Sequence, residues 1–276
     1  MEIIVTDDCS TDETYKIVSA VEDNRLQVFK HESNLGRVRN YNYGLYELAK
    51  GSWVLNLDGD DYLLDPYYIT DCISLINKYE KISFVQSDIT SYENKAGKRS
   101  SKHAMITGKD YLLNKLKVWT FNHMTTLYNR EMAVKSDYYT NDILSTDAAS
   151  ILRLCKNSNV IVKNGLAGYW RPHGENISLK SSYINKFNNY TKLLHSINQY
   201  YEDSSEISKK ELEKWTKKMQ IQLYLPILIS TFLKREFSIF KEAYRKFKKQ
   251  SGKIIFNHNT YVYIVQRLVF VITKRF

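Results

Sequence analysis

Acidic residues at three places in the sequence could bind a ligand or move a proton. They are Asp7-Asp8, the segment Asp58-Gly59-Asp60-Asp61, and Asp147 after Ser145-Thr146. Neighbouring carboxylates repel, so a folded protein keeps them together where a cation or hydrogen-bond donors offset the cost. Carboxylate oxygens that leave positions open for phosphate oxygens suit Mg²⁺ or Mn²⁺. The second cluster therefore predicts a divalent-metal site, although Asp and Gly are also common in solvated turns.

Short apolar runs that alternate with helical patterns must position these carboxylates. Strands separated by helices pair in parallel through right-handed crossovers, which predicts an α/β sheet. Ligands bind beyond the carboxyl ends of the strands in such sheets, and Asp7 and Asp58 each follow a predicted strand. The predicted strands cover residues 3–5, 26–29, 53–57, 82–85, 124–128, 160–162 and 166–170.

Helix signals fall between these strands. The spacing of Ser10 and Glu13 predicts a capping box that opens a helix ending near Val21. Asp65-Pro66 predicts the start of another helix. We also expect an apolar helical face of Val38, Tyr41, Leu45 and Leu48 capped by Gly51, a face of Ile69, Ile73 and Ile76, a helix over residues 146–156, and helices beyond Ser181.

The net charge of +10 over 276 residues is unevenly distributed. Residues 209–276 hold 16 Lys/Arg and four Asp/Glu, a net charge of +12, whereas residues 1–208 have a net charge of −2. The chain contains no recognised nucleic-acid-reading motif, and an acidic body argues against a nucleic-acid partner. We therefore expect a catalytic domain at residues 1–180 and a basic helical region at residues 181–276.

The basic region suits an anionic membrane surface, because Lys and Arg flank amphipathic segments there. A helical cap with a solvated basic face explains the same pattern equally well. Pro226 and Gln266-Arg267 interrupt its two apolar runs, so we expect no membrane-spanning helix. The three cysteines form no C-x-x-C pair, and the N-terminus lacks the features of a signal peptide. We expect a cytoplasmic protein, peripheral at the inner face of the plasma membrane.

Five short segments follow one another in a characteristic order. They are Ile3–Asp12, Asn34-Leu35-Gly36 with Arg39-Asn40, Leu57–Asp61, Ser145–Asp147 and Tyr169–Ser178. Together they resemble the family 2 glycosyltransferases with the GT-A fold, and the resemblance covers about residues 1–180. It implies a Rossmann-like α/β fold with a mixed, mainly parallel sheet flanked by helices and followed by a C-terminal helical appendage.

The resemblance also implies a reaction. A sugar would pass with inversion from a nucleotide-diphosphate sugar, expected to be a UDP-sugar, to the hydroxyl of a glycan or lipid-linked acceptor. Such a hexosyltransferase would use Mn²⁺ or Mg²⁺ and would serve surface polysaccharide or glycolipid synthesis. By matching positions we expect Asp147 as the catalytic base, Asp7, Asp8, Arg39 and Asp58 in donor binding, and Asp60, Asp61 and His173 at the metal.

Several of these residues have simpler explanations. Asp147 is also a common residue type at a helix N-terminus, where its charge is favourable. His173 is equally compatible with a structural histidine in a loop. Asn122-His123 and Thr125-Thr126 are candidates for the acceptor side, without support from their spacing.

Two departures from the family pattern leave alternatives open. The first strand of the family and its nucleotide-contacting loop are not found ahead of Ile3, and unpaired strand edges would result. Thr146 stands where the family has a Glu. A nucleotidyltransferase, which should show a Gly-rich phosphate loop, and a truncated non-catalytic binding protein are the alternative hypotheses.

Overall fold

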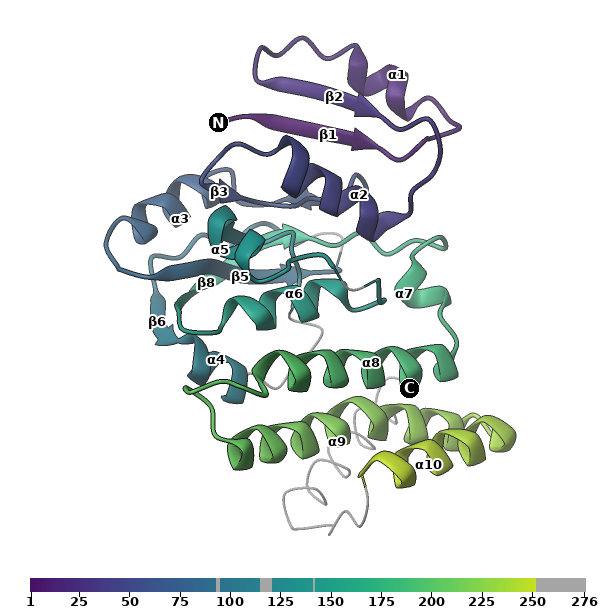
Figure 1. The fold of residues 1–276 in the computed structure, drawn as a ribbon. Helices are drawn as coiled ribbons and strands as arrows, with labels where there is room; N and C mark the ends of the chain where they lie inside the picture. Colours follow the sequence, from purple (N-terminus) through teal and green to yellow (C-terminus); the bar gives the residue numbers. More distant parts are fainter. Residues whose placement is uncertain (93–94, 115–120, 141, 252–276) are drawn as a thin grey trace. The chain divides into compact units, whose positions relative to one another are not determined.

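The computed structural model describes residues 1–92, 95–114, 121–140 and 142–251. The chain divides into two compact units. Among the described residues, the first unit comprises those of 1–114 and 121–173, and the second comprises those of 174–251. The domain boundary predicted at residue 180 stays a prediction. Figure 1 shows the order of the elements along the chain.

The first unit is built on two groups of strands. β1 (Ile3–Asp7) and β2 (Leu26–Lys30) pair in parallel as a separate two-stranded sheet. In the larger sheet β5 and β8 are parallel and the other described pairs are antiparallel. This confirms the prediction of a mixed α/β fold, but the expectation that its sheet is mainly parallel is wrong. Its order is β3-β7-β5-β8-β4, with β6 also pairing β8, and its strands are β3 (Trp53–Val54), β4 (Tyr62–Leu63), β5 (Ile82–Thr90), β6 (His103–Thr107), β7 (Thr126–Asn129) and β8 (Asn159–Tyr169).

Helices connect and cover these strands. The two short strands predicted over residues 160–162 and 166–170 are a single strand, β8. The apolar pattern from Val38 to Leu48 is one α-helix followed directly by a π-helical turn, η1. The helices of the first unit are α1 (Thr14–Ser19), α2 (Arg37–Tyr43), η1 (Gly44–Leu48), α3 (Tyr68–Ile76), α4 (Gly108–Asn114), α5 (Arg130–Lys135) and α6 (Thr146–Leu154).

Two predicted helix caps are wrong. Helix α1 begins at Thr14, and the backbone N–H of Ser10 instead donates to the Asp7 carboxylate at 2.9 Å. The chain leaves β1 through Cys9 with a φ of 64°, so Ser10 belongs to a turn and not to the helix. Gly51 does not cap η1, because the chain is already extended at Ala49.

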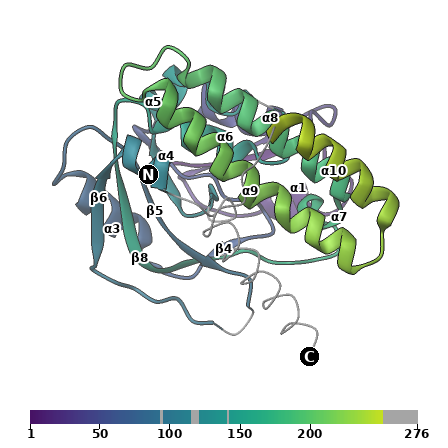
Figure 2. The same ribbon diagram turned by 90° about the horizontal axis from the view of Figure 1, so that it is seen from below.

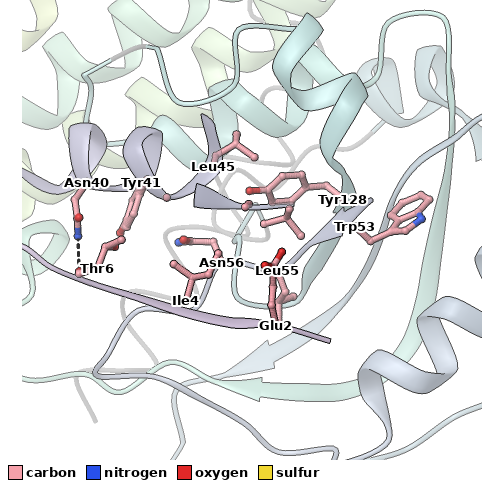
Figure 3. A pocket seen from close by; sticks show the side chains of 13 residues that line it. Glu2, Ile4, Thr6, Asn40, Tyr41, Leu45, Trp53, Leu55, Asn56 and Tyr128 are labelled. Atoms are coloured by element: carbon pink, nitrogen blue, oxygen red, sulfur yellow. Dashed lines mark hydrogen bonds between the residues drawn. The ribbon is translucent and has the colours of Figure 1, made fainter. Parts of the chain in front are cut away.

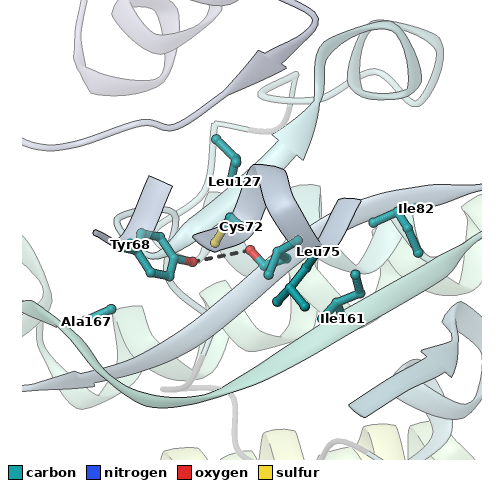
Figure 4. Close-up of a cluster of buried hydrophobic side chains, with 8 residues drawn as sticks. Tyr68, Cys72, Leu75, Ile82, Leu127, Ile161 and Ala167 are labelled. Carbon is teal, nitrogen blue, oxygen red and sulfur yellow. Dashed lines mark hydrogen bonds between the residues drawn. The ribbon is translucent and has the colours of Figure 1, made fainter. Parts of the chain in front are cut away.

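The buried face of α3 is only partly the predicted one, since Ile69 and Ile76 pack against the core as expected. Tyr68, Cys72 and Leu75 point into the core, whereas Ile73 is 36% exposed. The helix starts later than predicted, since the Asp65 side chain accepts the N–H of Tyr67 in a turn. Figure 4 shows the inward-facing α3 side chains packed with apolar residues of β5, β7 and β8: Ile82, Val85, Leu127, Ile161 and Ala167.

A groove lies between the two groups of strands (Figure 3). β1 lines one side of it with Glu2, Ile4 and Thr6, and residues 53–56 line another side. β1 pairs only with β2, and β3 pairs only with β7, among the strands of the described chain. Both strands therefore present an unpaired edge to the groove. At the β1 edge, the Asn40 side chain donates to the Thr6 carbonyl at 2.9 Å.

The second unit is helical. It contains α7 (Ile177–Lys180), α8 (Tyr183–Tyr201), α9 (Lys209–Leu233) and α10 (Phe237–Ser251). Figures 1 and 2 both show α8, α9 and α10 side by side, and each of the three contacts the other two. Phe187 of α8 stacks on Tyr224 of α9 with ring centroids 4.1 Å apart. None of the described helices is both long enough and apolar enough to span a membrane.

A glycine at the start of α4 offers a test of the packing. A Cβ at Gly108 would overlap the backbone carbonyl of Cys155, whereas a Cβ at Gly174 would meet open space. We predict that Gly108→Ala lowers the free energy of unfolding by about 1–3 kcal/mol, since backbone atoms cannot easily yield to an added methyl group. Urea denaturation measures this loss. Equal stability of the Gly108→Ala and Gly174→Ala proteins would contradict the described packing.

Candidate active site

The acidic turn Asp58–Asp61 follows β3. The N–H of Asp61 donates to the carbonyl of Asp58 at 3.0 Å, which bends the chain back on itself. As a result one oxygen from each of Asp58, Asp60 and Asp61 can be chosen so that all three lie within 4.8 Å of one another. The structure therefore brings together the three carboxylates that the sequence places in one motif.

Two donors hold Asp58 in place. The Tyr41 hydroxyl donates to Oδ1 at 2.6 Å, and the His123 ring approaches Oδ2 with Nε2 at 3.3 Å. Burial alone would raise the pKa of Asp58, but His123, Tyr41 and the Arg37 charge outweigh it and lower the pKa to about 2. Asp58 is thus a fixed negative charge at any physiological pH.

His123 is the residue that links this carboxylate to the protein interior. It is only 7% exposed. Its Nδ1 lies 3.2 Å from the Tyr139 hydroxyl and 3.2 Å from the Asn56 amide. Burial opposes the charged form, yet the nearby Asp58 and Asp147 carboxylates raise the pKa of His123 above its ordinary value. The sequence named His123 only as a candidate for the acceptor side.

Asp60 and Asp61 contact the end of β8 and the residues after it. His173 Nε2 lies 2.7 Å from Asp60 Oδ2, and the Arg171 N–H donates to Asp61 Oδ1 at 2.9 Å. Burial, with the charges of Asp60 and Asp58 beside it, raises the pKa of Asp61 to about 6, although the Arg171 hydrogen bond opposes this shift. A carboxylate that resists ionisation among other carboxylates is stabilised by a bound cation. The carboxylates of Asp58, Asp60 and Asp61 lie close enough together to hold a divalent cation, and the predicted role of His173 at that ion stays a prediction.

Asp147 lies in the first turn of α6, where the favourable end of the helix dipole meets its charge. One of its oxygens accepts the N–H of Ala148 at 2.8 Å. Burial raises the pKa of Asp147 above its ordinary value, against the opposing effect of His123 and Arg37. Because these charges act on one another, Asp147 belongs to the same electrostatic cluster as His123 and Asp58.

Arg37 supplies a positive charge to this cluster. Its guanidinium donates to the carbonyls of Ile143 and Leu144 at 3.3 and 3.1 Å, just ahead of α6. Arg39, the predicted donor-binding residue, is exposed. The two arginines lie on different sides of α2 because residues two apart on a helix do not share a face. Sequence spacing alone did not separate their roles.

Asp7 and Asp8 end β1 in different environments. The oxygens of Asp8 accept the N–H groups of Leu35 and Gly36 at 2.7 and 3.0 Å, which fixes the loop before α2. Asp7 is buried, and its Oδ2 has no hydrogen-bond partner among the described residues. Their predicted contacts with a donor stay predictions.

Thr125 and Thr126 do not line a site. Both are fully buried: Thr125 donates to the Ser87 carbonyl at 2.7 Å, and Thr126 donates to the Asn122 carbonyl. The side chain of Asn122 in turn accepts the N–H of Thr125 at 2.8 Å. These residues close the turn ahead of β7 and present His123 to Asp58.

Comparison with known proteins identifies the family of the first half of the chain. Residues 1–136 match the family model for glycosyl transferase family 2, a stretch that contains the acidic turn and His123. These residues, just under half of the chain, belong to this family. Asp147 and His173 lie beyond the matched residues, so the family match alone does not assign them.

Individual relatives are similar over part of their length. The chain is 39% identical over 62 residues to the glucosyltransferase WfaP of Escherichia coli, covering 22% of this chain and 24% of WfaP. It is 26% identical over 191 residues to the poly(ribitol-phosphate) β-N-acetylglucosaminyltransferase TarS of Staphylococcus aureus, covering 66% of this chain and 32% of TarS. It thus spans a quarter to a third of these curated relatives.

A solved structure has the same fold. The crystal structure of S. aureus TarS 1-349 in complex with UDP-GlcNAc matches with a TM-score of 0.69 and 21% identity. The match covers 89% of this chain and 71% of that chain. It confirms the predicted fold, a GT-A-like α/β unit followed by helices.

The pairing of His123 with Asp58 leads to a prediction about stability. We expect His123→Ala to lower the free energy of unfolding by about 1–3 kcal/mol, because it leaves a partly buried carboxylate with one donor fewer. Adding Asp58→Asn should recover part of the loss, since it removes the uncompensated charge. Chemical denaturation of the single and double variants measures both effects.

The matched control for this prediction is His103→Ala. That histidine hydrogen-bonds to the Tyr79 hydroxyl at 2.9 Å, and no carboxylate is seen to contact it in the described chain. We expect a smaller loss there, with no recovery from Asp58→Asn. If Asp58→Asn simply added its own destabilisation to His123→Ala, the two residues would not be coupled as described.

Proposed function

We propose that the protein transfers a sugar from a nucleotide-diphosphate sugar to an acceptor hydroxyl with inversion at the anomeric carbon. The observation that carries this proposal is the joining of the acidic turn, His123, Arg37 and Asp147 into one cluster of interacting charges. Membership of glycosyl transferase family 2 supports the reaction class. The UDP-GlcNAc complex of TarS and the UDP-Glc named for WfaP support a UDP-sugar as donor.

The donor would lie along the end of β1 and the acidic turn. Asp58, held by Tyr41 and His123, offers a fixed carboxylate for a ribose hydroxyl. Asp7 has one buried oxygen without a partner among the described residues, and this oxygen would accept a hydrogen bond from an N–H or O–H group of the nucleotide. Asp8 and Arg39 complete the proposed donor site, Asp8 through the loop whose backbone it fixes and Arg39 as an exposed positive charge.

Asp60, Asp61 and His173 would hold Mn²⁺ or Mg²⁺. Such an ion would neutralise the negative charge that develops on the departing diphosphate. The protein itself orients the three side chains: Arg171 fixes Asp61, and the contact between Asp60 and His173 would give way to shared coordination. An ion held by these three side chains would keep the departing diphosphate at the end of the site where they meet.

Asp147 would accept the proton of the acceptor hydroxyl as that oxygen attacks the anomeric carbon. Burial makes this carboxylate a stronger base than an exposed aspartate, because it raises the pKa of Asp147. General base catalysis of this kind contributes roughly 10²–10⁴-fold. The charges of His123 and Arg37 oppose this rise in the pKa of Asp147.

The acceptor is proposed to be a glycan or a lipid-linked saccharide in surface polysaccharide or glycolipid synthesis. WfaP is named for an acceptor linked to diphosphoundecaprenol and TarS for poly(ribitol-phosphate), both bacterial envelope molecules. A lipid-linked acceptor would place the enzyme at the inner face of the plasma membrane as a peripheral protein.

We predict that Asp147→Asn lowers the transfer rate by about 10²–10⁴-fold while donor binding is retained, since the amide cannot take the proton. Transfer from UDP-Glc and UDP-GlcNAc, with and without Mn²⁺, and UDP binding by calorimetry measure the two properties. The control is Asp142→Asn, which changes an exposed carboxylate of the same segment and should leave both unchanged. Loss of UDP binding in Asp147→Asn, or unchanged turnover, would contradict the role of a base.

The raised pKa of Asp147 predicts a pH dependence. Only the ionised carboxylate accepts a proton, so kcat/KM should fall as the pH drops through the pKa of Asp147. The acidic limb should then lie above about 3.9, the ordinary value for aspartate. The profile should be measured at saturating Mn²⁺, so that protonation of Asp61 does not limit the rate. A limb at or below the ordinary value would count against Asp147 as the base.

A further inference from the structure

Helix α10 carries aromatic side chains on a face that no described helix covers. Phe237 is 51% exposed and Tyr244 is 48% exposed, and Phe240 lies between them along the helix. Phe232, at the end of α9, is 56% exposed and extends the row. We call Phe232, Phe237, Phe240 and Tyr244 the aromatic patch.

The four rings form a continuous surface. Phe232 contacts Phe237 and Phe240 with ring centroids 6.1 and 5.6 Å apart, and Phe240 stacks on Tyr244 at 6.1 Å. The helix does not need this face for its own packing, because Ala243 and Phe247 are the residues buried against its neighbours. A contiguous exposed apolar surface of this kind marks a site of interaction.

Positive side chains surround the aromatic patch. Helix α10 contains five Lys/Arg and one Glu, a net charge of +4, and Lys234 and Arg235 precede it. The Lys246 ammonium group forms an ion pair with Glu242 at 3.3 Å and donates a hydrogen bond to the Asn188 side chain at 2.8 Å. The remaining cations of α10 are exposed and have no ion pair in the described part of the chain: Lys241, Arg245, Lys248 and Lys249.

We propose that the aromatic patch and the cations around it dock the second unit on a membrane surface that contains anionic lipid headgroups. Helices of this composition lie in the plane of the interface, with aromatic side chains among the headgroups and Lys/Arg near the phosphates. A nucleic acid or an acidic protein would neutralise the cations, but an anionic bilayer also removes the rings from water. One partner, the anionic bilayer, then contacts both the aromatic patch and the cations around it.

The two halves make separable contributions. Each Lys or Arg near an anionic surface strengthens binding about fivefold, and this attraction weakens as salt is added. The aromatic contribution depends on area removed from water and is insensitive to salt. Loss of rings and loss of charges should therefore weaken binding in distinguishable ways.

The test is flotation of the full-length protein with vesicles of phosphatidylcholine alone and of equal parts phosphatidylcholine and phosphatidylglycerol. We expect binding to the anionic vesicles only, with Phe237→Ser/Tyr244→Ser and Lys241→Gln/Arg245→Gln each reducing it at least tenfold. Only the second pair should also reduce the dependence on salt. All eight positions changed here and in the controls are exposed, and circular dichroism checks that the variants are folded.

Matched controls lie in the same unit. Ile177→Ser/Leu179→Ser removes two side chains that are 59% and 54% exposed on α7, and Lys209→Gln/Lys210→Gln removes two exposed cations at the start of α9. Both should bind anionic vesicles like the unchanged protein. Equal binding to neutral vesicles, no binding at all, or equal losses in the controls would overturn the proposal. The assay does not use the transfer reaction, so its outcome is independent of the proposed activity.

Discussion

The site depends on stabilising one partly buried negative charge, the carboxylate of Asp58. Asp58 is ionised at any physiological pH because Tyr41 and His123 approach its two oxygens. The tightly bonded turn before β7 and the Tyr41 side chain of α2 both serve this requirement, because they bring His123 and the Tyr41 hydroxyl to Asp58. The charge of His123 also lowers the pKa of Asp147, so the histidine that stabilises ionised Asp58 affects the protonation of Asp147 as well.

Much of the site was predictable from the sequence because its acidic residues are close in the chain. Asp58, Asp60 and Asp61 share one turn, and any fold that places this turn after a strand brings them together. The approach of His173 to Asp60 was also expected, but only through resemblance to a family. No local pattern connects residues more than a hundred positions apart.

Other features depend on tertiary contacts that the sequence does not display. Arg37 and Arg39 are equivalent as residue types, and only the position of α6 decides that Arg37 acts on the carboxylates. Helix α3 starts later than predicted because Asp65 forms a turn, and tertiary packing decides that Tyr68, Cys72 and Leu75 are its most buried residues. The α/β alternation itself was correct, since strand and helix periodicities differ strongly over the first 90 residues.

The groove between β1 and β3 has a consequence for exchange with solvent. The N–H of Ile3 donates to the Arg25 carbonyl, and the Asp7 carbonyl accepts the N–H of His31. In β1 the backbone N–H and C=O groups of odd-numbered residues therefore point toward β2, and those of even-numbered residues point toward the groove. The amide hydrogens of Ile4 and Thr6 therefore point away from β2, whereas the odd-numbered amides of the same strand are held in the ladder with β2. In deuterium oxide, the amide hydrogens of β1 should therefore exchange fast at even-numbered residues and slowly at odd-numbered ones.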